Sequence, residues 1–173
     1  NPEIVMAANK DPKFMELIKK DADLVTADGI GIVLGGKMLK TPVKERVTGY
    51  DLFTWLLHVG NLRKLRVYLI GATPAVMKIT KAKIAKDYPG IELVGAEDGY
   101  FKDGLKTVAK RIENTEPDLV FAAIGFPRQE ELISLLRQAE VPAIMMGVGG
   151  SFDVFSGAVK RAPEVFQKTH LEW

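Results

Sequence analysis

The sequence contains no cysteine and only two histidines among its 173 residues. Without cysteine the chain can form no disulfide, thiolate nucleophile or cysteine-ligated metal site. The histidines, His58 and His170, lie far apart in the sequence and within helical patterns. This arrangement argues against a serine–histidine–aspartate triad and against a histidine-rich metal site.

Long apolar runs and a strong net charge are missing as well. No stretch approaches the roughly 18 consecutive apolar residues of a membrane-spanning helix, and no signal peptide is recognisable. The 24 basic and 22 acidic residues give a net charge of +2, which is too small to predict nucleic-acid binding through a charged surface. With 47% hydrophobic and 27% charged residues, the composition is typical of a globular protein.

Helix and strand patterns alternate along the chain. Apolar runs that end in turns predict strands within residues 22–29, 66–71, 91–101, 118–125 and 142–150. Amphipathic stretches between them predict helices, with Asp11, Thr48 and Thr73 as N-caps. The glycine-rich stretch 29–40 predicts a helix packed tightly against its neighbours. The alternation predicts a single α/β domain over residues 1–173, a Rossmann-like and mainly parallel sheet with helices on both faces.

Each predicted strand runs into a loop that contains glycine. Ligands of such sheets bind beyond the carboxyl ends of the strands, so the loops "TADGIG", "IGATP", "AEDGYF", "IGFPRQE" and "GVGGSFD" are expected to meet at one edge. A glycine turn before a helix offers N–H groups that suit a phosphate, although glycine is also common in such turns for steric reasons alone. We therefore predict a nucleotide, and the residues expected to bind it are Gly71, Gly125, Gly147, Gly149, Gly150, Ser151 and Asp153.

Three polar residues near these loops are candidates for the chemistry. Asp28 follows a predicted strand and has no basic neighbour within five positions, so it is either a general base or a cap of the following helix. Arg46 precedes a glycine turn, where it binds a diphosphate bidentately or pairs with Glu45. Gln129 stands at a predicted helix start and suits contacts with hydroxyl and phosphate groups; the alternative is a surface turn.

Two acidic pairs resemble metal-binding motifs. Asp21 and Asp23 form a D-x-D, the pattern with which many sugar transferases hold a divalent metal, but the pair precedes the predicted strand instead of ending it. A helix end followed by a loop is the favoured interpretation. Glu97 and Asp98 supply oxygen ligands of the kind that magnesium prefers, but a solvated loop is favoured here too.

Several longer segments resemble one known family. These are "NPEIVMAANKD", "TADGIGIV", "ERVTGYDL", "IGFPRQE" and "GVGGSFDVFSGAVKRAPEVFQKTHLEW". In this order and spacing they resemble the WecG/TagA/CpsF glycosyltransferase family over essentially the whole chain. The last segment is long and specific, with Ser156 and Gly157 where the family often has alanine and glycine.

The resemblance implies an inverting glycosyltransferase that needs neither a metal nor a cofactor. Such enzymes transfer N-acetylmannosamine, or a related sugar, from a UDP-sugar donor to a polyprenol-diphosphate-linked GlcNAc acceptor, GlcNAc-diphospho-undecaprenol. The product begins the linkage unit of wall teichoic acid. The resemblance further implies Asp28 as the base, substrate contacts from Asn1, Thr26, Arg46 and Gln129, and "GVGGSFD" as the UDP loop.

The resemblance also bears on what surrounds the enzyme. Family members carry a threonine shortly before N-P-E and a basic tail after L-E-W, which docks on the cytoplasmic face of the membrane and adds arginines to the active site. The sequence contains neither, so it is expected to be a fragment. The apolar stretches "IGIVLGGKML" and "LFTWLLHVG" exceed what a small sheet needs to cover itself, which predicts a homo-oligomer.

Other functions stay open at this point. Within the same family the donor could instead be UDP-ManNAcA or UDP-glucose, with Lys160 or Arg161 beside an acidic sugar. Outside it, the chain could be a non-catalytic nucleotide-binding module or a dinucleotide-dependent oxidoreductase. The last is disfavoured because no G-x-G-x-x-G follows the first strand, and the absence of G-x-x-x-x-G-K-[ST] excludes a P-loop NTPase.

Overall fold

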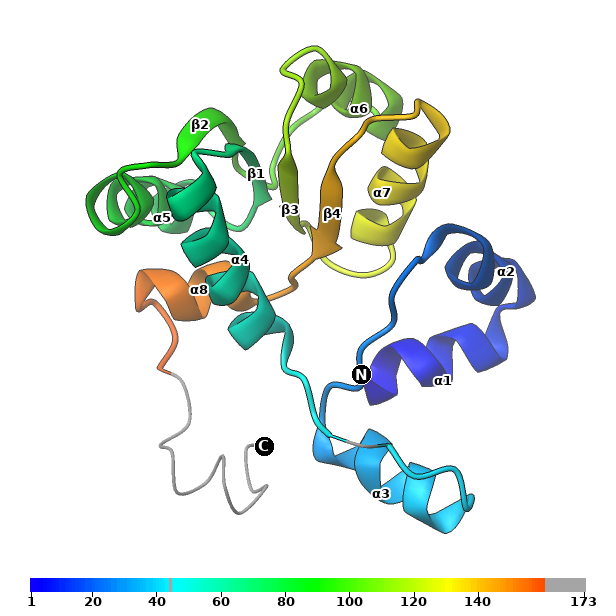
Figure 1. Ribbon diagram of the computed structural model, residues 1–173. Helices are drawn as coiled ribbons and strands as arrows, with labels where there is room; N and C mark the ends of the chain where they lie inside the picture. The colour runs from blue at the N-terminus through cyan, green and yellow to red at the C-terminus, as the bar shows by residue number, and fades with distance from the viewer. Residues whose placement is uncertain (44, 161–173) are drawn as a thin grey trace.

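The computed structural model describes residues 1–43 and 45–160, and Figure 1 shows how their helices and strands are arranged. The strands are β1 (Arg66–Gly71), β2 (Glu92–Glu97), β3 (Leu119–Ala123) and β4 (Ile144–Gly147). The helices are α1 (Pro2–Lys10), α2 (Pro12–Asp21), α3 (Ile30–Met38), α4 (Gly49–Arg63), α5 (Pro74–Asp87), α6 (Leu105–Glu113), α7 (Arg128–Gln138) and α8 (Ser151–Ser156). From α4 onward, helix and strand alternate as the sequence predicts.

The four strands of the described residues form one parallel sheet in the order β2-β1-β3-β4. Successive side chains of a strand point to opposite faces. Val67 and Leu69 accordingly belong to the core beneath α4, α5 and α8, whereas Tyr68 and Ile70 face α6 and α7. The two helix layers enclose the sheet (Figure 1). The predicted α/β fold, with a parallel sheet and helices on both faces, is confirmed.

The first of these cores contains a cluster of aromatic rings around Phe53. Its ring centroid lies 4.9 Å from that of Phe121 in β3, and 5.6 and 5.5 Å from those of Phe152 and Phe155 in α8. Phe53, Phe121 and Phe152 are fully buried. The contacts with Phe121 and Phe155 are edge-to-face, a geometry that stabilises a core beyond the area that it buries. The cluster holds α8, and with it the glycine loop after β4, against α4.

Side chains cap the helix starts as the sequence predicts. Asp11 accepts a hydrogen bond from the Lys13 N–H at 2.9 Å at the start of α2, and Thr73 is the N-cap of α5. At the start of α4, Thr48 Oγ1 accepts from the Asp51 N–H at 3.1 Å and donates to the Asp51 carboxylate at 2.6 Å. Such caps satisfy backbone N–H groups that have no partner inside the helix.

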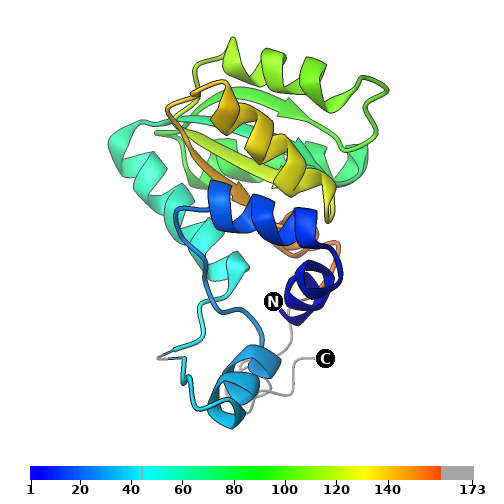
Figure 2. The ribbon, with the colours of Figure 1, turned by 90° about the vertical axis from the view of Figure 1, so that its right-hand side faces the viewer.

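Helix α2 lies beside α7, and α1 lies beside α2, outside the sheet (Figure 2). Phe14 of α2 contacts Phe126, in the loop before α7, with ring centroids 4.7 Å apart. The sequence analysis did not predict α1, although Asn1 and Pro2 are typical of an N-cap and a first helical position. Asn1 Oδ1 indeed accepts a hydrogen bond from the Ile4 N–H at 3.0 Å.

The strand predicted within residues 22–29 is wrong. No strand forms in this part of the described chain, and Leu24 and Val25 are 77% and 71% exposed. Asp23 binds Arg137 near the end of α7, which ties the segment to that helix. The apolar run of Leu24 and Val25 is too short to distinguish a strand from an extended loop.

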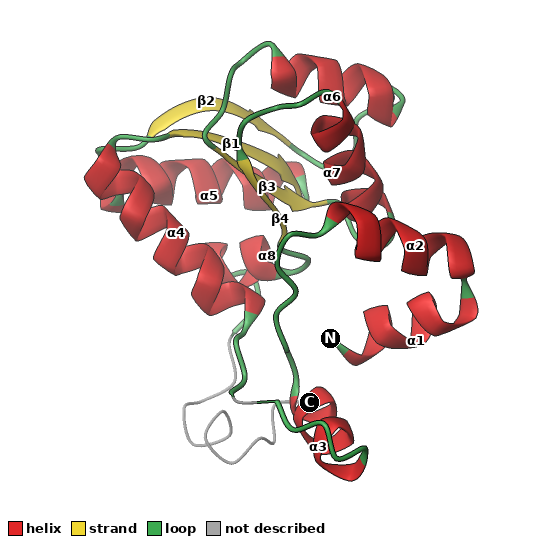
Figure 3. Cartoon of the chain, turned by 45° about the vertical axis from the view of Figure 1, so that its right-hand side comes forward, coloured by secondary structure: helices red, strands yellow, loops and turns green. Residues whose placement is uncertain are grey.

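The helix predicted within residues 29–40 forms as α3, but the tight packing expected for it is wrong. None of its nine residues, all of which the structure describes, is buried, and Leu34 and Met38 are 52% and 84% exposed. The helix projects away from the sheet (Figure 3). A Cβ on Gly36 would lie 2.8 Å from the Thr41 backbone oxygen, so this glycine serves the turn after the helix.

Candidate active site

A cavity of about 990 Å³ is lined by the whole of β4 and extends past its carboxyl end. Its walls come from the N-terminal helices, the segment before α3, the starts of α4 and α7, and the loop between β4 and α8. Ten of the twelve predicted site residues line it, namely Asn1, Thr26, Asp28, Arg46, Gln129, Gly147, Gly149, Gly150, Ser151 and Asp153. Segments from both ends of the described chain therefore meet at one site.

Gly71 and Gly125, the other two predicted nucleotide-binding residues, are not among the described residues that line this cavity. A Cβ on Gly71 would lie 2.3 Å from the backbone of Ala123, so glycine is needed there for the close packing of β1 on β3. Gly125 has a φ of +78°, a backbone conformation that favours glycine whatever surrounds it. Both glycines thus have a conformational reason that needs no ligand.

Asp28 is held at the start of α4. Its Oδ2 accepts a hydrogen bond from the Gly49 N–H at 3.1 Å, and the Val47 N–H donates to the Ala27 carbonyl at 2.9 Å beside it. The alternative role predicted for Asp28, a cap of the following helix, is wrong, because Gly29 is the N-cap of α3 and no side-chain hydrogen bond is present there. The carboxylate instead joins two segments that are 21 residues apart.

Arg46 reaches the same carboxylate from the other side. Its Nε lies 3.8 Å from Asp28 Oδ1, and the side chains of Arg46 and Asp28 are 19% and 36% exposed. The pair therefore stands at the cavity wall, where the guanidinium is close to Asp28 and to the space in front of it.

The side chain of Gln129 is buried behind the glycine loop, only 6% exposed. Its Nε2 donates to Glu130 Oε1 at 2.9 Å, and its Oε1 accepts from the Gly149 N–H at 3.3 Å. A Cβ on Gly147 would lie 2.6 Å from Gln129 Nε2. Gly147 is therefore bare because Gln129 fills the space beside it, and the surface-turn alternative for Gln129 is wrong.

The rest of the glycine loop faces the cavity. Gly149 has a φ of +50°, and a Cβ on Gly149 or Gly150 would meet no atom of the described residues within 4 Å. Ser151 is already engaged, since its hydroxyl donates to the Val148 carbonyl at 2.6 Å. Open backbone at Gly149 and Gly150 leaves room for a ligand to approach the main chain closely.

Glu130 also lines the cavity, although it was not predicted as a site residue. Its Oε2 is buried and has no hydrogen-bond partner among the described residues. Burial raises the pKa of the Glu130 carboxyl, and the hydrogen bond from Gln129 opposes this shift. Its position beside Gln129 in "IGFPRQE" was the available signal, but nothing in the local pattern indicates that its carboxylate is buried.

The D-x-D pair belongs to the packing of α2 on α7. Asp21 is the last residue of α2, and its carboxylate accepts a hydrogen bond from the buried Ser134 hydroxyl. Asp23 follows in the loop and binds Arg137, with 2.9 Å between Oδ1 and an Nη atom. The predicted helix end and loop is confirmed. Both carboxylates are engaged by α7 side chains.

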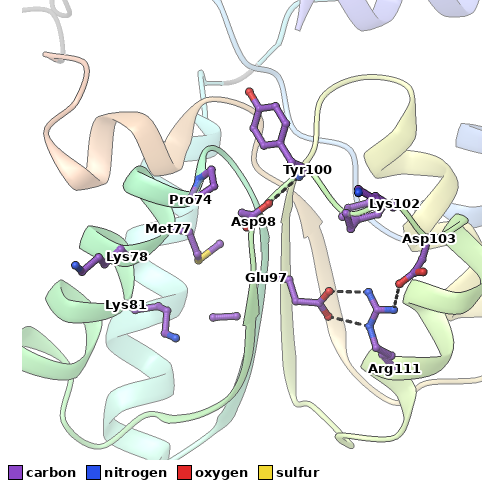
Figure 4. A pocket seen from close by; sticks show the side chains of 12 residues that line it. Pro74, Met77, Lys78, Lys81, Glu97, Asp98, Tyr100, Lys102, Asp103 and Arg111 are labelled. Atoms are coloured by element: carbon purple, nitrogen blue, oxygen red, sulfur yellow. Dashed lines mark hydrogen bonds and ion pairs between the residues drawn. The ribbon is translucent and has the colours of Figure 1, made fainter.

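A second hollow, of about 620 Å³, lies at the carboxyl end of β2 (Figure 4). Arg111 binds both oxygens of Glu97, at 2.7 and 3.2 Å, and also Asp103. The hydrogen bond from Arg111 lowers the pKa of Glu97. Asp98 accepts from the Tyr100 N–H at 2.9 Å, as a turn-forming aspartate does. Both acidic side chains are thus engaged in contacts within the protein. The favoured loop interpretation holds for Asp98, whereas Glu97 is the last residue of β2.

No group of three or more histidine, aspartate or glutamate side chains among the described residues is arranged to hold a metal ion. None of the helices described is both long and apolar enough to cross a membrane. The last part of the motif "GVGGSFDVFSGAVKRAPEVFQKTHLEW", including Arg161, lies outside the described residues.

Comparison with known proteins decides the family. The family model described as "Glycosyl transferase WecG/TagA/CpsF family" matches residues 1–173. The chain belongs to the WecG/TagA/CpsF glycosyltransferase family. The resemblance seen in the sequence motifs is thereby confirmed.

Three relatives share the name N-acetylglucosaminyldiphosphoundecaprenol N-acetyl-beta-D-mannosaminyltransferase. The chain is 45% identical to the one from Bacillus spizizenii, 42% identical to that from Bacillus subtilis and 39% identical to that from Staphylococcus aureus. Each comparison covers all 173 residues of the chain but only 66% or 67% of the relative. The chain therefore spans about two thirds of the length of these relatives.

Proposed function

We propose that the chain is the catalytic domain of an enzyme that transfers N-acetylmannosamine from UDP-ManNAc to GlcNAc-diphospho-undecaprenol, in the synthesis of the wall teichoic acid linkage unit. The observation that carries the proposal is the convergence of Asp28, Arg46, Gln129 and the glycine loop on one cavity. The names of relatives at 39% to 45% identity support the sugar and the acceptor. A non-catalytic nucleotide-binding module would have no need of a carboxylate–guanidinium pair beside the loop.

The proposed reaction is a single displacement with inversion. The 4-hydroxyl oxygen of the acceptor attacks the anomeric carbon of the donor, the bond from that carbon to UDP breaks, and UDP leaves with the bonding electron pair. The hydroxyl proton passes to Asp28, which acts as general base. The hydrogen bond from the Gly49 N–H holds Oδ2, so Oδ1, beside Arg46, is the oxygen that we assign to the proton transfer.

The proposed mechanism uses no metal, so protein groups must stabilise the charge that develops on the diphosphate. We assign this role to Arg46 and to the backbone at Gly149 and Gly150, which a ligand can approach. The described part of the cavity is otherwise acidic. Its charged lining residues are Arg46 and Arg137 on the basic side, and Asp21, Asp23, Asp28, Glu130 and Asp153 on the acidic side.

The acidic lining has two consequences for the proposal. A neutral donor sugar is favoured over UDP-ManNAcA, whose carboxylate would face this surplus of acids without added basic groups. The diphosphates also require more positive charge than the described residues provide. We propose that basic side chains outside the described residues complete the site, as the family tail implies, at the cytoplasmic face of the membrane that holds the acceptor.

Oligomerisation belongs to the proposal as well. The exposed side chains of Leu34, Met38 and Leu39 are 52%, 84% and 77% accessible, on or just after a helix that projects from the body of the protein. Exposed apolar groups gathered in this way are typical of an interaction surface. We propose that this surface contributes to contacts between copies of the chain, which the dependence of sedimentation on protein concentration tests.

A donor panel tests the function. The purified protein is incubated with a soluble diphosphate-lipid GlcNAc analogue and UDP-ManNAc, UDP-GlcNAc, UDP-glucose or UDP-ManNAcA, each with and without chelator, and products are identified by mass spectrometry. We expect product from UDP-ManNAc at the same rate in chelator. Product from another donor alone would refute the assigned sugar, loss of product in chelator would refute the metal-free mechanism, and binding of NAD but not of UDP would refute the donor class.

A further inference from the structure

Glu130 follows Gln129 in α7, and its carboxylate accepts a hydrogen bond from the Gln129 amide. We propose that Glu130 is a positioning residue of the donor site: by accepting a hydrogen bond from Gln129, it fixes which end of that amide faces the glycine loop. The inference rests on the proposed function, because it supposes that a UDP-sugar binds against this loop. It adds a residue that neither the sequence motifs nor the relatives' names assign to the reaction.

The two ends of the Gln129 amide make opposite kinds of contact. Nε2 donates to Glu130 Oε1 at 2.9 Å, and Oε1 accepts from the Gly149 N–H at 3.3 Å. A flipped amide would set an NH₂ group against the Gly149 N–H and an oxygen against a carboxylate oxygen. Because an ionised carboxylate accepts hydrogen bonds and cannot donate them, Glu130 permits one orientation, and that orientation holds Gly149.

The surroundings leave the amide little freedom to find another partner. Gln129 is 6% exposed, and its Nε2, Cδ and Cγ would lie 2.6, 2.9 and 3.2 Å from a Cβ on Gly147. Without the Glu130 acceptor, Nε2 would become a buried donor that lacks a partner, which is unfavourable. The amide would then rotate or withdraw, and the Gly149 N–H would lose its acceptor.

Glu130 does not suit its position on grounds of stability. Its Oε2 is buried and has no hydrogen-bond partner in the described part of the chain, and a buried polar atom in this state destabilises the fold. A glutamine could accept the same bond from Gln129 without burying a charge. A carboxylate at this position lowers stability, so a functional role explains its presence and a purely structural role does not.

Three single variants test the proposal. Glu130→Met removes the acceptor, and Glu130→Gln keeps an oxygen that can accept. Glu131→Met is the matched control, because Glu131 is the exposed neighbour in the same turn of α7 and its loss changes the charge equally. UDP affinity is measured by calorimetry, and the donor KM and kcat are measured in the product assay.

We expect Glu130→Met to weaken UDP binding and raise the donor KM about 10- to 100-fold, the range for losing a hydrogen bond to a charged group. The kcat should change less than about threefold, because Asp28 keeps its contacts. Glu130→Gln should stay within about fivefold of wild type, with an equal or higher Tm. Glu131→Met should bind UDP like wild type.

Two further measurements separate positioning from other roles. In a Gln129→Met background, Glu130→Met should cause no additional loss of UDP affinity, since the residue through which it acts is gone. Without any ligand, the Gly149 amide should exchange faster in Glu130→Met than in wild type, as followed by NMR.

The inference is overturned by any of four results. The first is wild-type UDP affinity in Glu130→Met, and the second is an equal loss of UDP affinity in Glu130→Gln and Glu130→Met. The third is a further loss of UDP affinity when Glu130→Met is added to Gln129→Met, and the fourth is a Tm for Glu130→Met so low that the variant does not fold. A wild-type protein that fails to bind UDP refutes the proposed donor instead, and exchange at Gly149 then still decides whether Glu130 positions the amide.

Discussion

Replacing Asp28 separates its chemistry from its structural contact, because the carboxylate does two things at once. Oδ2 accepts the Gly49 N–H at the start of α4, and Oδ1 lies 3.8 Å from Arg46 Nε. Asp28→Asn keeps an oxygen that can accept from Gly49 but removes the base and the charge. Asp28→Ala removes all three. Both variants therefore remove the proton acceptor, but only Asp28→Ala also removes the contact with the start of α4.

The structure sets the size of each effect. Losing the acceptor for Gly49 resembles the loss of a helix cap and costs about 0.5–2 kcal/mol, which lowers Tm by about 1–8 °C in a domain of this size. The partly exposed ion pair with Arg46 contributes less than about 1 kcal/mol. Thermal unfolding should therefore show a clear fall for Asp28→Ala and a small one for Asp28→Asn.

The activity should follow a different order. Both variants should lose about 10²- to 10⁴-fold in kcat, the range for a missing general base, while UDP affinity measured by calorimetry stays within about threefold of wild type. Asp51→Ala is the control, because it breaks the hydrogen bond between Thr48 and Asp51 at the same helix start and leaves Asp28 in place. It should lower Tm and spare kcat.

The result that would refute the reasoning is specific. If Asp28→Asn turns over like wild type whereas Asp28→Ala is inactive, Asp28 acts only by holding α4, and another group must take the proton. If Asp51→Ala loses activity as strongly as Asp28→Asn, the loss follows from the displaced helix start and not from the missing base.

The remaining predictions concern the glycine loop and the second hollow. Gly147→Ala should lower both Tm and UDP affinity, because its Cβ would lie 2.6 Å from Gln129 Nε2. Gly150 faces open space in the described structure, so Gly150→Ala should leave Tm unchanged and weaken UDP binding alone. Equal losses of Tm in the two variants would contradict this distinction. Glu97 has its pKa lowered below the ordinary 4.5 by Arg111, so its stabilising effect should be present above pH 4.5 and be lost as pH falls through the lowered pKa. Urea unfolding should accordingly show that Glu97→Gln is less stable than wild type at neutral pH and that the gap narrows in acid, and a gap independent of pH would contradict the assignment.

Much of the fold was predictable because its signals are local. A strand such as β3 is an apolar run bounded by turns, and a helix such as α5 begins with a threonine cap followed by proline. These patterns depend on neighbours a few positions away, and the chemistry of the caps is the same in any protein. The fold class followed from the alternation of such elements, which predicts a parallel sheet covered on both faces.

The failures share a physical cause. The apolar run at Leu24 and Val25 resembles a strand, but its position is decided by Asp23, which binds a side chain 114 residues away. The sequence predicts Gly147 as a ligand-binding glycine, but it does not reveal that Gln129, from another element, fills the space beside Gly147. In both cases the deciding contact is a long-range hydrogen bond or steric contact, and no local pattern reports which distant side chain occupies the space.

The composition of the site could be predicted, but the way in which its two halves are joined could not. Gln129 and the glycine loop stand on the sheet and its helices, whereas Asp28 and Arg46 belong to a segment that adds no strand to the described sheet. That segment reaches the sheet through Asp23 on α7 and through Asp28 on α4. The residue proposed to move the proton is thus also one of the contacts that place its own segment. Under the proposed mechanism Asp28 serves both the geometry of the candidate site and its chemistry, and only a variant that preserves the geometry can reveal the chemistry.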